Sequence, residues 1–370
     1  MKDIPVLLLT GYLGSGKTTL VNRILGNRKG IRFAVIVNDI GEVNIDADLI
    51  AQGGVVGKKD DSLVALQNGC ICCTLKMDLV EQLRDIVAMK KFDYIVIEAS
   101  GICEPEPIAR TICSFPYMGP EFVKDGLPRL DCIVTVVDTL RLKDEFNCAK
   151  DLLRGNIGED DLEKLVIEQL EFCNMVLLNK ASEVKPEELG KVREIVHAIQ
   201  PQARIIECDW GGVELDEILD TGLFNYDSVA GSAAWVSAVE GNDEEGESEE
   251  YGIGTYVYRA RRPLDINKFD NFIAKHLPAG IIRIKGICYF GDEPDICYLF
   301  EQAGSQISLK NIGQWYATMP EDELRQAVLE DPTIAVDWDP LWGDRIQKLV
   351  FIGQHLDRDA VKAALDFCLQ

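Results

Sequence analysis

The segment from Gly11 to Thr18 constrains the fold of this chain more than any other feature. It reads G-Y-L-G-S-G-K-T, which matches the pattern G-x-x-x-x-G-K-[ST] in full. An apolar run at 6–10 precedes it and an apolar-periodic stretch at 18–25 follows, which predicts a buried strand, a glycine-rich turn and a helix. Backbone N–H groups in such a turn, together with the positive helix N-terminus, attract phosphate. The segment therefore predicts a nucleoside triphosphate site.

Two side chains of this loop and one carboxylate beyond it have predicted roles in phosphate chemistry. Lys17 would neutralise charge between the β- and γ-phosphates, and the Thr18 hydroxyl would hold Mg²⁺. Glu98 ends an apolar strand and precedes Ala99-Ser100-Gly101, so it would hold water of the Mg²⁺ shell, while Gly101 would let the backbone approach the γ-phosphate. An exposed glutamate at a strand end is the alternative for Glu98. We predict Lys17 and Glu98 as catalytic residues, and as nucleotide contacts Gly11, Gly14, Ser15, Gly16, Lys17, Thr18, Thr19 and Gly101.

The segment Asn179-Lys180-Ala181-Ser182 also follows a predicted strand, and it resembles the base-reading loop N-K-x-D of GTPases. In that loop the aspartate accepts two hydrogen bonds from the guanine edge, and a single serine hydroxyl cannot form that bidentate pair. Glu183 is adjacent and could substitute, but the sequence does not indicate its direction. We predict that Asn179 and Lys180 contact the base and that GTP is the nucleotide, with weakened selectivity against ATP.

The 370 residues are 47% hydrophobic and 27% charged, which fits two folded domains. Runs of Val, Ile and Leu alternate with helical patterns up to about residue 226, which predicts an α/β fold, a parallel sheet with helices on both faces. After the first strand, the predicted strands of this sheet cover 33–37, 94–98, 133–138, 175–179 and 204–208. Residues 1–226 form this P-loop domain, and 227–253 form a linker containing the acidic run EGNDEEGESEE. Residues 254–370 form a smaller α+β domain. Its predicted strands cover 254–261, 281–290 and 296–302, and its predicted helices cover 265–276 and 357–367.

Charge and cysteine content exclude several classes of protein. A net charge of −24 argues against a broad nucleic-acid-binding face. No apolar run approaches the roughly 20 residues of a membrane span, and the first apolar run is too short for a signal peptide, so we expect a cytoplasmic protein with no membrane or nucleic-acid partner. Twelve cysteines in such a chain do not indicate disulfides. Five lie in apolar runs and are predicted to be small core residues: Cys132, Cys173, Cys288, Cys297 and Cys368.

Cys70, Cys72 and Cys73 differ because they are clustered just before a predicted helix. A helix N-terminus favours the thiolate, and adjacent thiolates suit Zn²⁺ or another borderline-soft metal. Three sulfurs do not close a tetrahedral site, so a fourth ligand is needed, and exchangeable coordination suits delivery. A redox pair and buried packing cysteines are the alternatives.

Taken together, these stretches resemble the CobW family of P-loop GTPases, relatives of the nickel chaperones HypB and UreG. The matching segments span nearly the whole chain and include TGYLGSGKTTLVNRIL, VNDIGEVNID, NGCICCTL, VIEASG, VLLNKAS, IRIKG, YLFEQAGSQI and WDPLWGDRIQKLVFIG. The resemblance implies metal-responsive GTP hydrolysis coupled to transfer of Zn²⁺ or Co²⁺, and we expect slow intrinsic turnover because the sequence shows no general base or arginine finger. It also implies that Cys70, Cys72 and Cys73 match the metal motif and that Glu42 supplies an oxygen ligand. Asp39 and Glu42 read equally well as exposed loop acids.

Two departures from the family pattern leave alternatives open. Ser182 stands where guanine selectivity is read, and an acidic run replaces the histidine-rich stretch that many relatives carry near the domain linker. The favoured function is a GTP-driven metallochaperone that delivers zinc, or else cobalt, to a client metalloprotein through the C-terminal domain. The alternatives are a nucleotide-dependent activator of a metalloenzyme or corrinoid protein with a structural metal, and a non-enzymatic cysteine-based metal or redox sensor. The client, the physiological metal and the oligomeric state, a homodimer included, are left open.

Overall fold

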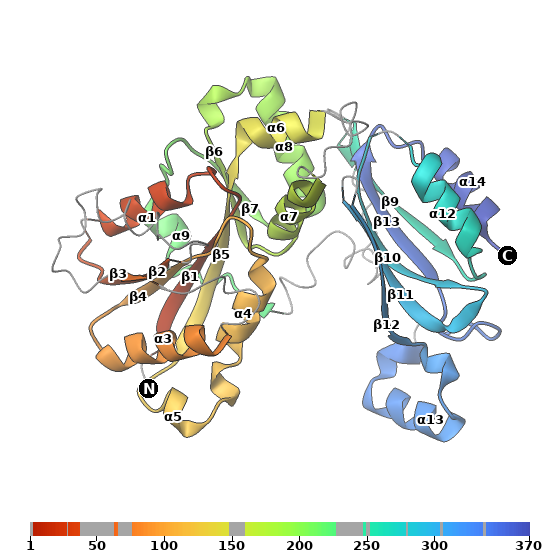
Figure 1. The fold of residues 1–370 in the computed structure, drawn as a ribbon, viewed down its shortest axis with the longest axis horizontal. Coiled ribbons are helices and arrows are strands. Elements are labelled where there is room, and N and C mark those ends of the chain that lie inside the picture. The colour runs from red at the N-terminus through yellow and green to blue at the C-terminus, as the bar shows by residue number, and fades with distance from the viewer. Residues whose placement is uncertain are drawn as a thin grey trace. The chain divides into compact units, whose positions relative to one another are not determined.

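A computed structural model describes residues 3–27, 29–37, 63–65, 76–147, 160–226, 247–248, 252–278, 280–303, 306–335 and 338–370. The chain forms two compact units, each built on its own β-sheet (Figure 1). The first unit has a parallel sheet and the second an antiparallel one, so the predicted combination of an α/β fold with a smaller α+β domain is confirmed.

The first unit contains a seven-stranded sheet in the order β3-β2-β4-β1-β5-β6-β7, in which all neighbouring strands are parallel. The central strands are continuous apolar runs because helices cover both of their faces. Strands predicted at 33–37, 94–98 and 175–179 have those same bounds. The strands are β1 (Ile4–Thr10), β2 (Phe33–Val37), β3 (Leu63–Ala65), β4 (Tyr94–Glu98), β5 (Pro128–Asp138), β6 (Met175–Asn179) and β7 (Arg204–Glu207).

Helices cover both faces of this sheet (Figure 1). On one face, Leu20, Val21 and Ile24 recur at helical spacing on α1 and pack with Ile218 of α9 over alternate residues of the strands. On the other face α3 and α4 pack together, and α4 contacts β1 and β5. The helices are α1 (Lys17–Leu25), α3 (Lys76–Met89), α4 (Pro105–Cys113), α5 (Pro120–Val123), α6 (Thr139–Asn147), α7 (Asp160–Glu171), α8 (Pro186–Ile199) and α9 (Leu215–Ile218), with 3-10 turns η1 (Phe115–Tyr117) and η2 (Ala181–Glu183).

Because every strand of this sheet runs in one direction, the carboxyl ends of the strands meet at a single edge. Glu98 at the end of β4 is in register with Leu9 of β1 and with Val37, the last residue of β2. Asp138 at the end of β5 is likewise in register with Asn179 at the end of β6. Ligands of open α/β sheets bind at this edge, so the topology gathers the predicted site residues there.

The second unit has a six-stranded antiparallel sheet in the order β12-β11-β10-β13-β9-β8. Helices α12 and α14 lie beside each other over one face (Figure 1), and their apolar residues form a core with the sheet. The strands are β8 (Glu247–Ser248), β9 (Ile253–Ala260), β10 (Ile281–Phe290), β11 (Glu293–Ala303), β12 (Gln306–Gln314) and β13 (Gln347–Gln354). The helices are α12 (Ile266–Lys275), α13 (Glu321–Glu330) and α14 (Arg358–Cys368), with 3-10 turns η3 (Tyr316–Thr318) and η4 (Pro332–Ala335).

Several elements of the second unit differ from the sequence prediction. Asp265 and Asp357, predicted as helical residues, are N-caps: Asp265 accepts from Asn267 N at 3.0 Å, and Asp357 accepts from Ala360 N at 2.9 Å. Strand β11 extends the predicted 296–302 strand at both ends. Strands β12 and β13 were not predicted, since β12 is an edge strand that alternates only over 306–310 and β13 is a short apolar run without alternation. Within the predicted linker, Glu247 and Ser248 pair with the start of β9.

Candidate nucleotide and metal site

The phosphate loop between β1 and α1 has a backbone shape that depends on its glycines. Gly11, Gly14 and Gly16 have φ angles of 128°, 78° and 106°, a region that side chains disfavour. A Cβ atom on Gly11 would lie 2.1 Å from the Val136 carbonyl oxygen, and one on Gly16 would lie 2.3 Å from Asn179 Nδ2. The loop is therefore held tightly against β5 and β6, which is why the motif requires glycine at its first and sixth positions.

Lys17 opens helix α1 directly after Gly16. Its side chain is buried, and its Nζ donates to the carbonyl oxygens of Gly11 at 2.7 Å and Tyr12 at 3.2 Å. The ammonium group therefore lies across the loop, in the positive field of the helix N-terminus. A buried cation beside a helix N-terminus favours an anion, so this arrangement fits the phosphate-binding role that the motif predicts for Lys17.

Thr18 and Glu98 come together at the end of the sheet. The Thr18 hydroxyl donates to Glu98 Oε1 at 2.8 Å, and Glu98 is only 1% exposed. Glu98 is therefore not the exposed strand-end acid that was its alternative reading. A hydroxyl and a carboxylate side by side are the hard oxygen donors that Mg²⁺ prefers, so these two residues fit a magnesium ion bound with a nucleotide.

Gly101 follows Glu98 and packs against the phosphate loop itself. A Cβ atom at Gly101 would lie 2.7 Å from Leu13 N and 2.8 Å from Leu13 Cγ. Gln169 of α7 holds the Gly101 loop from behind, because its Nε2 donates to the carbonyl oxygens of Gly101 at 3.3 Å and Cys103 at 3.1 Å. The close approach found at Gly101 is to Leu13 of the phosphate loop, and the predicted approach to the γ-phosphate stays a prediction.

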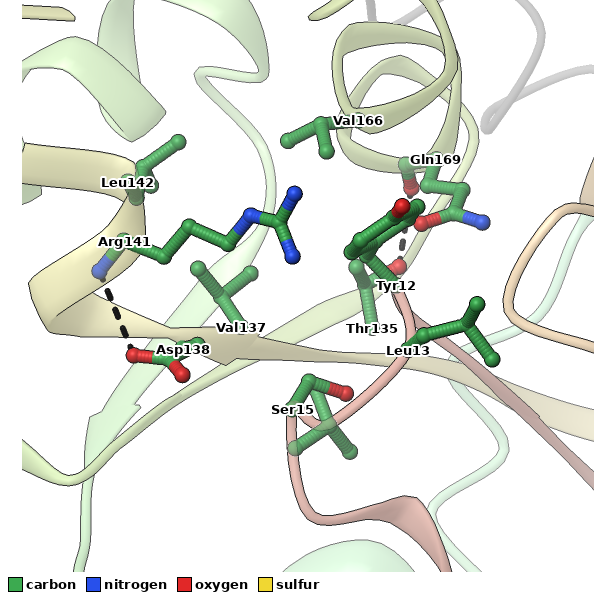
Figure 2. Close-up of a pocket in the computed structure, with 11 residues that line it drawn as sticks. Tyr12, Leu13, Ser15, Thr135, Val137, Asp138, Arg141, Leu142, Val166 and Gln169 are labelled. Atoms are coloured by element: carbon green, nitrogen blue, oxygen red, sulfur yellow. Dashed lines mark hydrogen bonds between the residues drawn. The ribbon is translucent and has the colours of Figure 1, made fainter. Parts of the chain in front are cut away.

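A small cavity of about 20 Å³ lies against the phosphate loop (Figure 2). That volume holds about one water molecule and is too small for a nucleotide. The Arg141 guanidinium lies 4.1 Å from the centre of the Tyr12 ring, a cation–π contact. The backbone N–H of Arg141 donates to Asp138 Oδ1 at 3.2 Å. The contact of Arg141 with the phosphate loop was not predicted, because no sequence pattern connects Arg141 to that loop.

Asn179 joins the phosphate loop to the loop after β7. Its Nδ2 donates to the Ser15 carbonyl oxygen at 2.8 Å, and its Oδ1 accepts from Gly211 N at 3.1 Å. Lys180 has a left-handed φ of 60°, and its Nζ lies 2.5 Å from Asp138 Oδ2. Both residues therefore lie at the predicted edge of the sheet, and Asn179 is held by two backbone groups of the protein.

Ser182 contacts a carboxylate that the sequence analysis did not single out. Ser182 N and Ser182 Oγ both donate to Asp209 Oδ1, at 3.1 and 3.0 Å. Asp209 follows β7 and is partly buried, and Trp210 beside it is 79% exposed at a left-handed φ of 55°. Glu183, the substitute acid considered from the sequence, is exposed at the end of η2. No motif marks Asp209, because its contact with Ser182 spans 27 residues.

The predicted transition-metal ligands Cys70, Cys72, Cys73 and Glu42, with Asp39, lie outside the described residues. Within the described ranges, no group of three or more His, Cys, Asp or Glu side chains could hold a metal ion. The five cysteines predicted as core residues are confirmed, since Cys132, Cys173, Cys288, Cys297 and Cys368 are all buried free thiols. Burial raises the pKa of Cys132, Cys173 and Cys297 to about 12, so these thiols stay protonated at neutral pH.

Arg283 and Glu301, both buried in the second unit, belong to one cluster of ion pairs. Glu301 lies 3.3 Å from Arg283 Nη2, 3.2 Å from Lys285 Nζ and 3.3 Å from Lys310 Nζ. Burial alone would raise the pKa of Glu301, but these three cations lower it to about 2. The cluster is a closed ionic network and presents no group for chemistry.

Across the described parts of both units, no helix has the length and apolar character needed to cross a membrane.

Comparisons with known proteins agree with this geometry. Residues 5–207 match the family model "CobW/HypB/UreG, nucleotide-binding domain", and residues 253–369 match "Cobalamin synthesis protein cobW C-terminal domain". The chain is 36% identical over 384 residues to zinc-regulated GTPase metalloprotein activator 1 of Dictyostelium discoideum, covering all of this chain and 80% of that protein. It is 27% identical to the zinc chaperone CobW of Sinorhizobium sp, covering 98% and 96% of the two chains.

One solved structure that matches this chain is that of Zn(II)-bound YjiA GTPase from E. coli. It is 21% identical to this chain, covers the full length of both chains and superposes with a TM-score of 0.44.

Proposed function

The chain belongs to the CobW/HypB/UreG family, and from that premise we propose that it is a GTPase that couples its nucleotide state to the binding and delivery of zinc. The observation that carries this proposal is the joined set of Lys17, Thr18 and Glu98. Lys17 lies across the phosphate loop, and Thr18 is bonded to a buried Glu98. This set fits the lysine and the magnesium ligands that triphosphate hydrolysis uses, in a chain whose relatives carry the names of zinc chaperones and a zinc-regulated GTPase.

The described residues act on the nucleotide mainly by electrostatics and positioning. Backbone N–H groups of the loop and the Lys17 ammonium stabilise charge on the transferring phosphoryl group. Thr18 and Glu98 would hold Mg²⁺, which supplies positive charge between the phosphates. We identify no general base among the described residues that contact this set. Slow intrinsic hydrolysis, accelerated by a partner, is therefore part of the proposal.

The proposed coupling depends on where the chain leaves the sheet. Val37 ends β2 in register with Glu98, so the segment that carries Asp39 and Glu42 departs from the edge that holds the magnesium ligands. After this segment β3 pairs with β2 in the sheet, and the stretch that carries the three cysteines leads from β3 to α3, which begins three residues after Cys73. Glu42, Cys70, Cys72 and Cys73 are our proposed zinc ligands. We propose that a change at the γ-phosphate acts on both stretches, which flank β3, as in other nucleotide switches.

The experiment is a zinc titration of the full chain with a non-hydrolysable GTP analogue and with GDP. We expect zinc affinities that differ by about 5- to 150-fold between the two nucleotides, the usual range of coupling between two sites. Cys72→Ser should lose zinc and keep the GTP analogue, while Lys17→Ala should do the reverse. Cys113→Ser is the matched control, since Cys113 is a half-buried thiol outside the cluster. Equal zinc affinity in both nucleotide states would overturn the coupling.

The receiving partner is a further part of the proposal. We propose that a client metalloprotein takes the zinc, in accord with the name metalloprotein activator of one relative. We also propose that this client contacts the 254–370 domain. The cytoplasm is the compartment we propose, because all eight cysteines among the described residues are free thiols, as expected in a reducing environment. Co²⁺ in place of Zn²⁺ is a second metal for the same titration.

A further inference from the structure

Replacement of aspartate by Ser182 leaves the base-reading loop without the acid that usually selects guanine. Guanine presents two donors on its Watson–Crick edge, N1–H and the 2-amino group. A carboxylate accepts both at once, while a serine hydroxyl is a single short group. A chain of this kind that still selects GTP needs a carboxylate from elsewhere at the same place.

We propose that Asp209 supplies this carboxylate, held in position by Ser182. The Ser182 N–H and hydroxyl both donate to Asp209 Oδ1, at 3.1 and 3.0 Å. Two donors on one oxygen fix the carboxylate beside the turn where the usual aspartate would stand. Among the described residues, Asp209 Oδ2 receives no hydrogen bond. Two oxygens held this way have lone pairs left to accept from N1–H and the 2-amino group.

The loop that carries Asp209 is fastened to the phosphate site at several points. Asn179 Oδ1 accepts from Gly211 N at 3.1 Å, and the same Asn179 side chain donates to Ser15 of the phosphate loop. Gly211 also lies against α1, since a Cβ atom there would be 3.1 Å from Leu20 Cα. The 182–209 pair therefore has a set position relative to the phosphates, as base selection requires.

Glu183 is the other acid near this turn, and the structure does not favour it. Glu183 closes the 3-10 turn η2 with its side chain exposed, and its backbone N–H donates to the Lys180 carbonyl oxygen at 3.1 Å. Asp209 could also have a purely structural role, because its carboxylate accepts the Ser182 N–H and so caps the turn. A merely structural cap and a base-reading acid differ in one measurable property, nucleotide selectivity.

The experiment measures equilibrium binding of GTP, ATP, ITP and XTP to the full chain and to Asp209→Asn. Asparagine keeps the acceptor for Ser182 but exchanges the other oxygen for a donor. We expect GTP to bind on the order of 100-fold more weakly, with ATP unchanged. XTP should bind better than to the wild type, because xanthine has an oxygen where guanine has its 2-amino group. Glu183→Gln is the matched control and should leave all four affinities unchanged.

Moving the carboxylate from position 209 to position 182 tests whether its place near the base, and not the residue that carries it, decides selectivity. The double variant Ser182→Asp with Asp209→Ser moves the carboxylate back into the N-K-x-D position, and we expect it to regain GTP selectivity that Asp209→Asn loses. Failure of Asp209→Asn to change the ratio of GTP to ATP affinity would overturn the proposal. This inference rests on the proposed function only for the choice of GTP. Wild-type preference for ATP would overturn both, whereas absent zinc coupling would leave the role of Asp209 standing.

Discussion

The phosphate end and the base end of the nucleotide site lie on one edge of the same sheet, but they are built differently. The phosphate end is contained in consecutive residues, and the Lys17 ammonium bonds to carbonyl groups five and six residues before it. The base end is assembled across the chain, since Asn179 bonds to Ser15 and Ser182 bonds to Asp209. The backbone geometry of the phosphate end restricts it to one sequence pattern. The base end depends on side chains from distant parts of the chain, so more than one sequence could place a carboxylate there.

The largest effect is expected from Lys17→Ala, which removes the cation of the phosphate end. We expect GTP and ATP affinities to fall together by on the order of 100-fold, because the lost charge contacts phosphates that both nucleotides share. Fluorescent nucleotide titration measures both values, with exposed Lys185→Ala as the control. A loss confined to GTP would contradict the division between the two ends.

Asn179→Ala should come next, because Asn179 joins the two ends. The change leaves the Ser15 carbonyl and the Gly211 N–H without their bonds in a buried place, at a cost of about 1–3 kcal/mol each. We expect a lower free energy of unfolding in urea and weaker binding of both nucleotides. A variant as stable as the wild type would show that the two ends are not joined through this side chain.

Gly11→Ala tests the backbone requirement at the phosphate end. The new Cβ atom would meet the Val136 carbonyl oxygen at a left-handed φ, and we expect a loss of about 2–3 kcal/mol, or several degrees in Tm. Gly14→Ala is the matched control, because Gly14 has a left-handed φ but open space around its Cβ position. It should cost about 1 kcal/mol, and an equal cost at both sites would contradict the packing argument.

The smallest effect is expected from the buried thiol of Cys208 at the base end. Burial first, and then the neighbouring charge of Asp209, raises the pKa of Cys208 to about 11. The thiol is therefore protonated in the folded state, and ionisation favours the unfolded chain. Stability from this group is present below pH 9 and is lost as the pH rises towards 11. Iodoacetamide labelling at pH 8, read by mass spectrometry, should leave Cys208 unmodified in the native protein, whereas rapid labelling would contradict its burial.

Much of the fold followed from local pattern. The apolar runs of β2, β4 and β6 had the bounds that the structure has, because strands buried on both faces must be continuously apolar. Strand β13 escaped prediction because it is a short apolar run without alternation. Strand β12 alternates only over 306–310 and leaves its apolar residues Ile307 and Leu309 exposed, so it does not have the pattern of a half-buried strand along its length. The helix ends at Asp265 and Asp357 shifted by one residue, since each aspartate caps its helix with its side chain.

By itself, the sequence determined the phosphate-loop motif, because eight consecutive residues carry the glycines, the lysine and the threonine on which the shape of this loop depends. Spacing alone could also nominate Glu98, since it ends a strand parallel to β1. Only the tertiary structure decided what stands beside Ser182 and what covers Tyr12. Asp209 reaches its place from the loop after β7, and Arg141 reaches its place from helix α6, which follows β5. The order and register of the strands, which no single segment encodes, set which of these side chains meet.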